Sequence, residues 1–352
     1  MVTAIALVSC FILSLLLTPV VKKIAFKIGA TDQPNQRKVH TGAMARLGGI
    51  SIYAAFLAGL VILQPENAYL PYILVASTII IVTGVLDDIT ELSAKWKLLG
   101  QILAAVIVII GGVHIDFINL PFGGQLELGL LSIPITLLWI IGITNAINLI
   151  DGLDGLAAGV SSIVLATISV LAIIQGDIFI VAMGIALLGG TLGFLVHNFN
   201  PAKIFMGDTG ALFLGFMIAV ISLLGFKNVT VFSLIVPIII LAVPISDTFF
   251  AIIRRIVHRQ PLSLADKSHL HHCLLNLGYT HKQTVLMIYA ISAICGLAAV
   301  IFTLSTLWVS LTIIMLLLIA VEIMVERIGL ISKEYRPFLK LYNKLTNSPR
   351  RL

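Results

Sequence analysis

The sequence predicts an all-α integral membrane protein, a polytopic bundle of about eleven transmembrane helices. The chain of 352 residues is 59% hydrophobic and only 11% charged. Apolar runs of about 17 to 25 residues, the length that a helix needs to cross a bilayer, recur along most of the chain, at 2–21, 46–63, 71–86, 97–113, 131–149, 156–174, 178–196, 209–225, 231–251, 284–303 and 306–325. They leave no stretch for a separate soluble domain, so residues 1–352 are predicted to form one domain.

The basic residues predict how the bundle is oriented. With eleven spans, 21 of the 22 Lys and Arg residues fall on one side, and only Lys227 falls on the other. Cytoplasmic loops carry the excess of Lys and Arg, so we expect the amino terminus outside and the carboxyl terminus in the cytoplasm. This sorting, next to anionic lipid, accounts for the net charge of +6, and no nucleic-acid partner is expected.

Three further features concern single spans and loops. The first span has no basic region before its apolar core and no small-residue cleavage site, so it is expected to remain as a helix. The longest outer loop alternates Leu126 and Leu128 after a Gly123-Gly124 turn, which predicts a small β-hairpin near 115–128 with a structural role. The ninth span contains Pro237 and Pro244, which predict a kink and one wall of a lipid groove.

Acidic residues at the inner ends of the spans are the main functional signal. Carboxylates close to lipid are costly and usually functional. Six aspartates are predicted to lie at the cytoplasmic face: Asp87, Asp88, Asp151, Asp154, Asp208 and Asp247. An anionic phosphate can approach such a group only with a cation, and oxygen ligands favour Mg²⁺, with Mn²⁺ as the second choice. The sequence therefore predicts a metal-assisted site that handles phosphates.

Each motif also has a structural alternative. Asp87 and Asp88 could simply end the third span. Steps of three place Asn145, Asn148, Asp151 and Asp154 on one helix face, where they could bind a base or sugar, or could join helices.

Asp208 precedes a span, where it could be an N-cap or part of a phosphate site. Lys203 could reach a phosphate or only set orientation. His269, His271 and His272 are expected to donate to phosphate oxygens, with a zinc site or an inert loop as alternatives.

Four blocks together resemble the polyprenyl-phosphate N-acetylhexosamine-1-phosphate transferases, within glycosyltransferase family 4. The blocks are Leu86-Asp87-Asp88, Asn145 to Gly155, Phe205 to Gly210 and His269-Leu-His271-His272, in the family's order. The His-Leu-His-His form resembles the branch that uses UDP-N-acetylglucosamine, including the enzymes that initiate teichoic-acid linkage units. The branch that transfers phospho-MurNAc-pentapeptide has three consecutive histidines, whereas Cys273 stands at the third place here.

The resemblance implies a reaction in which UDP-N-acetylglucosamine and undecaprenyl phosphate give the lipid-linked diphosphate sugar and UMP. It implies a multi-pass protein of the cell membrane, with its site facing the cytoplasm and a homodimer as an open alternative. The residues implied are Asp208 for Mg²⁺; Asp87 and Asp88 for the lipid phosphate, with Asp87 as candidate base; Asn148, Asp151 and Phe205 for the nucleotide; His271 and His272 for the diphosphate or sugar; Asn145, Asp154, Lys203 and His269 around them; and Lys38 and His40 for a substrate-contacting first loop.

Two other function classes stay open from the sequence alone. An intramembrane prenyltransferase would use aspartate-rich motifs that Asp87, Asp88 and Glu91 loosely resemble, but it would leave Asp208 and the histidines without a use. A transporter would place its acids at the bilayer midplane, whereas these acids gather at one face, and no inverted repeat is visible.

Overall fold

The computed structural model describes residues 1–32, 42–119, 124–226, 234–257, 259, 268–328 and 337. Its helices are α1 (Val2–Ile28), α2 (Gly49–Leu63), α3 (Leu70–Thr90), α4 (Ala94–Ile110), α5 (Ser132–Ile150), α6 (Leu156–Gln175), α7 (Ile178–Asn198), α8 (Gly207–Phe226), α9 (Ile235–Ile240), α10 (Ala242–Val257), α11 (Leu270–Asn276), α12 (His281–Leu304) and α13 (Leu307–Ile328), with a 3₁₀ turn at Gly129–Leu131. Two antiparallel pairs of short strands join β1 (Thr31–Asp32) to β2 (Met44–Ala45) and β3 (Phe117–Asn119) to β4 (Gln125–Glu127).

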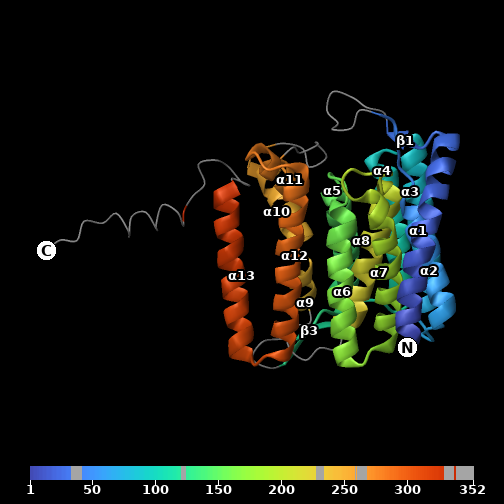
Figure 1. Ribbon diagram of the computed structural model, residues 1–352. Coiled ribbons are helices and arrows are strands. Elements are labelled where there is room, and N and C mark those ends of the chain that lie inside the picture. The colour runs from blue at the N-terminus through green and yellow to red at the C-terminus, as the bar shows by residue number, and fades with distance from the viewer. Residues whose placement is uncertain are drawn as a thin grey trace.

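The long helices run side by side as one bundle (Figure 1). Helix α8 lies at its centre, where it packs against α3 and α5, and every residue from 209 to 223 is buried. A helix that is apolar on all sides is stable only when neighbours cover it on all sides. Its amino-terminal end carries Asp208, so the most deeply buried helix of the fold holds a predicted site residue.

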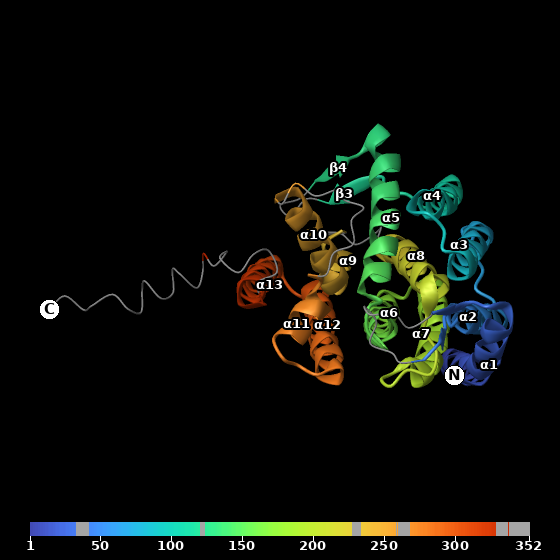
Figure 2. The same ribbon diagram turned by 90° about the horizontal axis from the view of Figure 1, so that it is seen from above.

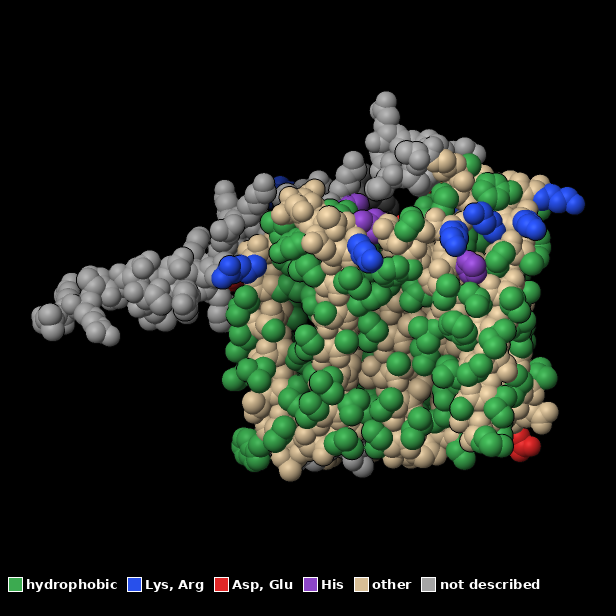
Figure 3. All heavy atoms as spheres, viewed as in Figure 1, with side chains coloured by type: hydrophobic (Ala, Val, Ile, Leu, Met, Phe, Trp, Pro, Cys, Tyr) green, Lys and Arg blue, Asp and Glu red, His purple; other side chains and the backbone are tan. Residues whose placement is uncertain are grey.

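The described part of the chain has eight helices that are long and apolar enough to cross a membrane. They are α1, α3, α5 together with the 3₁₀ turn before it, α6, α7, α8, α12 and α13, and α2 is a shorter apolar helix. Hydrophobic side chains cover the flank of the bundle, while Lys and Arg side chains gather along one edge of it (Figure 3). The protein is therefore an all-α, multi-pass membrane protein.

Two local predictions are confirmed. Strands β3 and β4 pair antiparallel, with Phe117 opposite Glu127, as the predicted hairpin requires. The ninth span is broken into α9 and α10, which are separated at Leu241. Pro244 has no N–H to donate to the preceding turn, so a continuous helix cannot pass this point unchanged. The hairpin lies at the end of the bundle opposite to α11 and β1 (Figure 1).

Candidate active site

Two carboxylates from distant parts of the chain meet at a single lysine. The Nζ atom of Lys97, on α4, donates to Asp208 Oδ2 at 2.8 Å and to Asp87 Oδ2 at 3.1 Å. The other oxygen of Asp208 accepts a hydrogen bond of 2.7 Å from the Nδ2 atom of Asn148. Charge-assisted hydrogen bonds of this kind are strong and fix geometry. The ends of α3, α4, α5 and α8 are thereby joined at the Asp87–Lys97–Asp208 cluster.

Asp88 holds the first turn of α8 in place. Its Oδ1 accepts from the backbone N–H of Asp208 at 3.0 Å, and its Oδ2 accepts from the N–H and hydroxyl of Thr209 at 3.0 and 2.6 Å. These bonds satisfy backbone donors that a helix start leaves without partners. The Asp88 side chain is buried, so its oxygens position Asp208 rather than face a substrate.

Replacing Asp88 with Ala should therefore destabilise the protein more than the loss of an ordinary helix cap. The change leaves three donors without an acceptor, two of them buried, and each buried one costs about 1–3 kcal/mol. The comparison is Asp177→Ala, which removes one capping bond to the Ile180 N–H at the start of α7 and should cost about 1 kcal/mol. Melting temperatures in detergent measure both, and equal losses would contradict the positioning role of Asp88.

The turn between α5 and α6 is fastened to the loop before α8. Asp154 Oδ2 accepts from the Asn200 Nδ2 and from the backbone N–H of Ala202, both at 3.0 Å. The Asn198 side chain accepts from the Gly155 N–H at 3.1 Å and donates to the Ile204 carbonyl at 3.0 Å. The carboxylate of Asp154 thus holds the loop before α8 in place. Asp154 also lies on the wall of a cavity.

A cavity of about 710 Å³ opens beside these groups. Its wall brings together segments from most of the chain, including Arg46, Asn148, Asp151, Asp154, Phe205, Asp208, His272 and His281. A volume of this size is typical of a site for a small molecule. Six of the twelve predicted site residues that the structure describes therefore lie on this wall.

Asp151, which lies on this wall, can exchange a proton near neutral pH. Burial, followed by the negative charges of Asp208, Asp88 and Asp154, raises the pKa of Asp151 to about 7. Burial and neighbouring like charges both disfavour the ionised carboxylate. A group with a pKa near the working pH is well suited to give or accept a proton.

The histidine segment forms a second group, anchored by Asp247. The carboxylate of Asp247 bonds to His269 Nδ1 at 2.9 Å and accepts from the Leu270 N–H at 2.7 Å. The rings of His271 and His272 lie 4.2 Å apart between centroids. The Nε2 atom of His271 is buried without a hydrogen-bond partner, and its ring lies so close to Gly152 that a Cβ there would overlap it.

Stability should fall in acid because of His271. Burial, and then the neighbouring His272, lower the pKa of His271 from 6.5 to about 3. In the unfolded chain the ring takes up its proton first, so stability is lost as pH falls from about 6.5 towards 3. Between pH 6.5 and 5 this loss is about 2 kcal/mol.

The variant His271→Gln has no imidazole to protonate, so its stability lacks this pH dependence. The melting temperature of the wild type, relative to that of the variant, should therefore be lower at about pH 5 than at about pH 7.5. The same difference between the two proteins at both pH values would contradict the buried neutral state of His271.

Six predicted residues do not line the cavity, and two more lie outside the described residues. Asn145 is used in joining helices, since its Nδ2 donates to Gln101 Oε1 at 2.6 Å and to the Ile141 carbonyl at 2.8 Å. The others that do not line the cavity are Lys203, which is exposed, His269, which is held by Asp247, and Asp87, Asp88 and His271. Lys38 and His40 lie outside the described residues.

Two carboxylates of the site, Asp208 and Asp87, could hold a metal ion. Within the part of the chain that the structure describes, no group of three or more His, Cys, Asp or Glu side chains is arranged to hold a metal ion. Mg²⁺ is usually bound by one or two carboxylates together with water and substrate phosphates. Asp208 and Asp87 fit this pattern, because they already hold a cationic group, the Lys97 ammonium, between them.

Sequence reasoning missed three residues. From the sequence, Lys97 is only one of the basic residues that orient the bundle, although a lysine within the first turn of an apolar helix is itself a signal. Arg46 lines the cavity and lies 3.6 Å from Asp32 and 3.8 Å from Glu91. His281 lines it from the first turn of α12, with a buried Nε2 that has no hydrogen-bond partner.

Comparison with known proteins identifies the family of the chain. Residues 70–226 match the profile of glycosyl transferase family 4. The chain is 50% identical over 349 residues to a probable undecaprenyl-phosphate N-acetylglucosaminyl 1-phosphate transferase of Bacillus subtilis (strain 168), covering 97% of each protein.

Two further relatives are more distant. Identity is 36% to a decaprenyl-phosphate N-acetylglucosaminephosphotransferase of Mycobacterium tuberculosis (strain ATCC 25618 / H37Rv), over 76% of this chain and 74% of the relative. Identity is 28% to an undecaprenyl-phosphate alpha-N-acetylglucosaminyl 1-phosphate transferase of Salmonella typhi, over 82% of this chain and 80% of the relative. The chain belongs to glycosyl transferase family 4, in the branch of the polyprenyl-phosphate N-acetylglucosamine-1-phosphate transferases.

Proposed function

We propose that this protein transfers N-acetylglucosamine-1-phosphate from UDP-N-acetylglucosamine to undecaprenyl phosphate, with Mg²⁺ as cofactor. The observation that carries the proposal is the convergence of Asp87, Lys97 and Asn148 on Asp208, which together with Asn148 lines a cavity of about 710 Å³. The names of the relatives support both the sugar phosphate and the polyprenyl acceptor. The products are undecaprenyl-diphosphate-N-acetylglucosamine and UMP.

The reaction exchanges one phosphorus–oxygen bond for another. An oxygen of the lipid phosphate attacks the phosphorus that bears the sugar, and the bond from that phosphorus to the UMP oxygen breaks. Phosphoryl transfer depends mainly on positioning and on stabilising charge. Mg²⁺, held by Asp208 with Asp87 beside it, would neutralise the diphosphate, which otherwise could not approach so many carboxylates.

The side chains have separate parts in this scheme. Lys97 and Arg46 supply positive charge for phosphate oxygens, and Asn148 orients Asp208. Asp87 positions the lipid phosphate, which at neutral pH is already largely ionised and needs little help from a base. His271 is neutral because of its low pKa, so it can offer a hydrogen bond at Nε2 without adding charge.

The nucleotide and its leaving phosphate would occupy the rest of the cavity. The partly buried Phe205 ring on the wall offers a surface for the uracil. Asp151, with a pKa near 7, can exchange a proton with a phosphate oxygen as UMP departs. Asp88 fixes the start of α8 by accepting from the Asp208 N–H, and Asp154 fixes the preceding loop by accepting from the Ala202 N–H.

We also propose how the protein sits in the cell membrane. The eleven predicted spans correspond to α1 to α8, the α9–α10 pair, α12 and α13, with the amino terminus outside. The sorting of Lys and Arg supports a cytoplasmic active site. The motif blocks that resemble linkage-unit enzymes support a first membrane step of a cell-wall polymer, with wall teichoic acid as the destination. Loss of wall teichoic acid after depletion of the protein would test that destination.

A transfer assay with purified protein tests the chemistry. Undecaprenyl phosphate is supplied with UDP-N-acetylglucosamine, UDP-N-acetylgalactosamine or UDP-MurNAc-pentapeptide, and EDTA is added before Mg²⁺ or Mn²⁺ is restored. The expected result is a lipid-linked product from UDP-N-acetylglucosamine that EDTA abolishes and Mg²⁺ restores. A product from UDP-MurNAc-pentapeptide alone would assign the protein to peptidoglycan synthesis. Joining of a prenyl diphosphate to an aromatic ring, with no use of UDP-sugars, would support the prenyltransferase alternative.

A further inference from the structure

Two amide side chains meet between α4 and α5 inside the bundle. The Asn145 Nδ2 atom donates to Gln101 Oε1 at 2.6 Å, and the Gln101 Nε2 atom donates back to Asn145 Oδ1 at 3.3 Å. Gln101 is only 2% exposed, and neither side chain lines the cavity of the candidate active site. Buried amides in a membrane bundle join helices to one another, so this pair bears on how α4 is placed against α5.

The amide pair lies one helical turn from the contacts that hold Asp208. On α4, Gln101 follows Lys97 by four residues, and these two residues therefore share one helix face. On α5, Asn145 precedes Asn148 by three residues, which again is about one turn. Lys97 reaches Asp208 Oδ2 at 2.8 Å, and Asn148 reaches the other oxygen at 2.7 Å. The two helices are thus joined twice in succession, first through the amide pair and then through Asp208.

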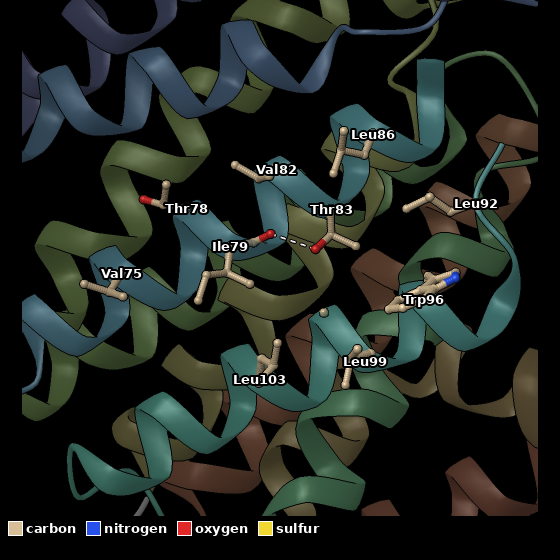
Figure 4. A pocket seen from close by; sticks show the side chains of 11 residues that line it. Val75, Thr78, Ile79, Val82, Thr83, Leu86, Leu92, Trp96, Leu99 and Leu103 are labelled. Atoms are coloured by element: carbon tan, nitrogen blue, oxygen red, sulfur yellow. Dashed lines mark hydrogen bonds between the residues drawn. The ribbon is translucent and has the colours of Figure 1, made fainter. Parts of the chain in front are cut away.

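Helix α4 lies at the edge of the bundle, beside α3 and α5 (Figure 2). Towards α3 it presents Leu99 and Leu103, opposite Ile79 (Figure 4), and these two leucines are 43% and 49% exposed. Apolar packing has no preferred direction, whereas a hydrogen bond restricts both distance and angle. The amide pair on the α5 side is therefore a contact that can fix how far α4 extends along its neighbour.

We propose that Gln101 is a positioning residue for the transfer reaction: paired with Asn145, it sets the register of α4 along α5 and thereby holds the Lys97 ammonium at Asp208. This inference rests on the proposed function. A helix that slips by one residue moves by about 1.5 Å, which exceeds the whole spread of hydrogen-bond distances, about 2.7–3.2 Å. Without the pair, Lys97 would keep its charge but lose its place beside the phosphate that it is to neutralise.

Leucine substitutions separate positioning from stability. Gln101→Leu and Asn145→Leu each leave a buried amide without its partner, so both should lower the melting temperature and reduce kcat by about 10–100-fold. The double variant, Gln101→Leu with Asn145→Leu, replaces both partners with apolar groups and should regain much of the melting temperature. Its kcat should nevertheless stay low, because apolar side chains do not restore the register of α4. Recovery of kcat together with the melting temperature would show a purely structural pair and would overturn the proposal.

The KM and a matched control variant complete this measurement. The KM for UDP-N-acetylglucosamine should stay close to that of the wild type, since neither amide lines the cavity. A raised KM with an unchanged kcat would mean that the amides serve nucleotide binding, and would also overturn the proposal. The control Tyr53→Phe removes another hydrogen bond between neighbouring helices, the 2.8 Å bond between the Tyr53 and Thr78 hydroxyls on α2 and α3, and should leave kcat unchanged. A loss of kcat as large as in Gln101→Leu would mean that any lost contact between helices impairs turnover, against the proposal.

A cycle with Lys97 tests whether Gln101 acts through it. In Lys97→Met the ammonium is already missing, so adding Gln101→Leu should lower the remaining kcat by less than about twofold, which is within the usual error of such cycles. A further fall as large as the one caused by Gln101→Leu alone would mean that Gln101 acts independently of Lys97, and would overturn the proposal.

The outcomes separate this inference from the function on which it rests. A wild type that transfers no sugar phosphate to undecaprenyl phosphate would overturn the proposed function, and the positioning role with it. An active wild type in which Gln101→Leu retains its full kcat would overturn the positioning role alone and leave the proposed function in place.

Discussion

Asp208→Asn should reduce transfer of the sugar phosphate on the order of 10²–10³-fold, the usual effect of removing one preorganised electrostatic group from a site. The substitution keeps the shape of the side chain but removes the charge that faces Lys97 and that would hold Mg²⁺. It also replaces an acceptor with an amide, so one of the contacts from Lys97 Nζ and Asn148 Nδ2 loses its acceptor. The loss should appear in kcat rather than only in a KM.

The measurement is steady-state transfer from labelled UDP-N-acetylglucosamine over a range of Mg²⁺ concentrations. Asp177→Asn is the matched control, because Asp177 caps α7 through the Ile180 N–H and Asn caps a helix equally well. We expect the control to retain wild-type activity and melting temperature, and Asp208→Asn to lose about 1–3 kcal/mol of stability, the usual cost of one donor left without an acceptor. Undiminished activity of Asp208→Asn, at the same Mg²⁺ requirement, would remove Asp208 from the metal-binding role.

Much of this architecture follows from local rules in the sequence. Apolar runs of membrane-spanning length predict helices because backbone groups in lipid must be paired within the segment, and the structure has a helix in each predicted range, with α9 and α10 sharing one. The break in the ninth span follows from Pro244. Spacing also predicts the shared face of Asn148 and Asp151, and both line the cavity.

What the sequence could not predict depends on contacts between distant segments. The partner of Asn145 is Gln101 on another helix, so a residue on the predicted face joins helices instead of facing the cavity. Asp88 and Asp87 are neighbours with different surroundings, because successive helix positions point about 100° apart. One supports the backbone of α8, whereas the other meets Lys97. No periodicity distinguishes these roles.

Lys97 is the clearest example, since its bond to Asp208 joins residues 111 positions apart. We expect Lys97→Met to reduce transfer at least about 100-fold. The methionine keeps the length of the side chain but leaves Asp87 and Asp208 facing each other without a cation between them. Two such carboxylates repel, and breaking a partly buried charge pair by removing one partner is strongly destabilising.

The control is Lys95→Met, which makes the same change at an exposed position two residues earlier on α4 and should leave activity and stability unchanged. The double variant Lys97→Met with Asp87→Asn completes a cycle that isolates the interaction of the two side chains. Removing the charge of Asp87 should recover part of the melting temperature lost in Lys97→Met without recovering activity, because the cation beside the phosphate is still missing. If instead the double variant loses the sum of the melting-temperature losses of Lys97→Met and Asp87→Asn, Lys97 does not neutralise Asp87. Its effect on turnover must then come from its contact with the substrate alone.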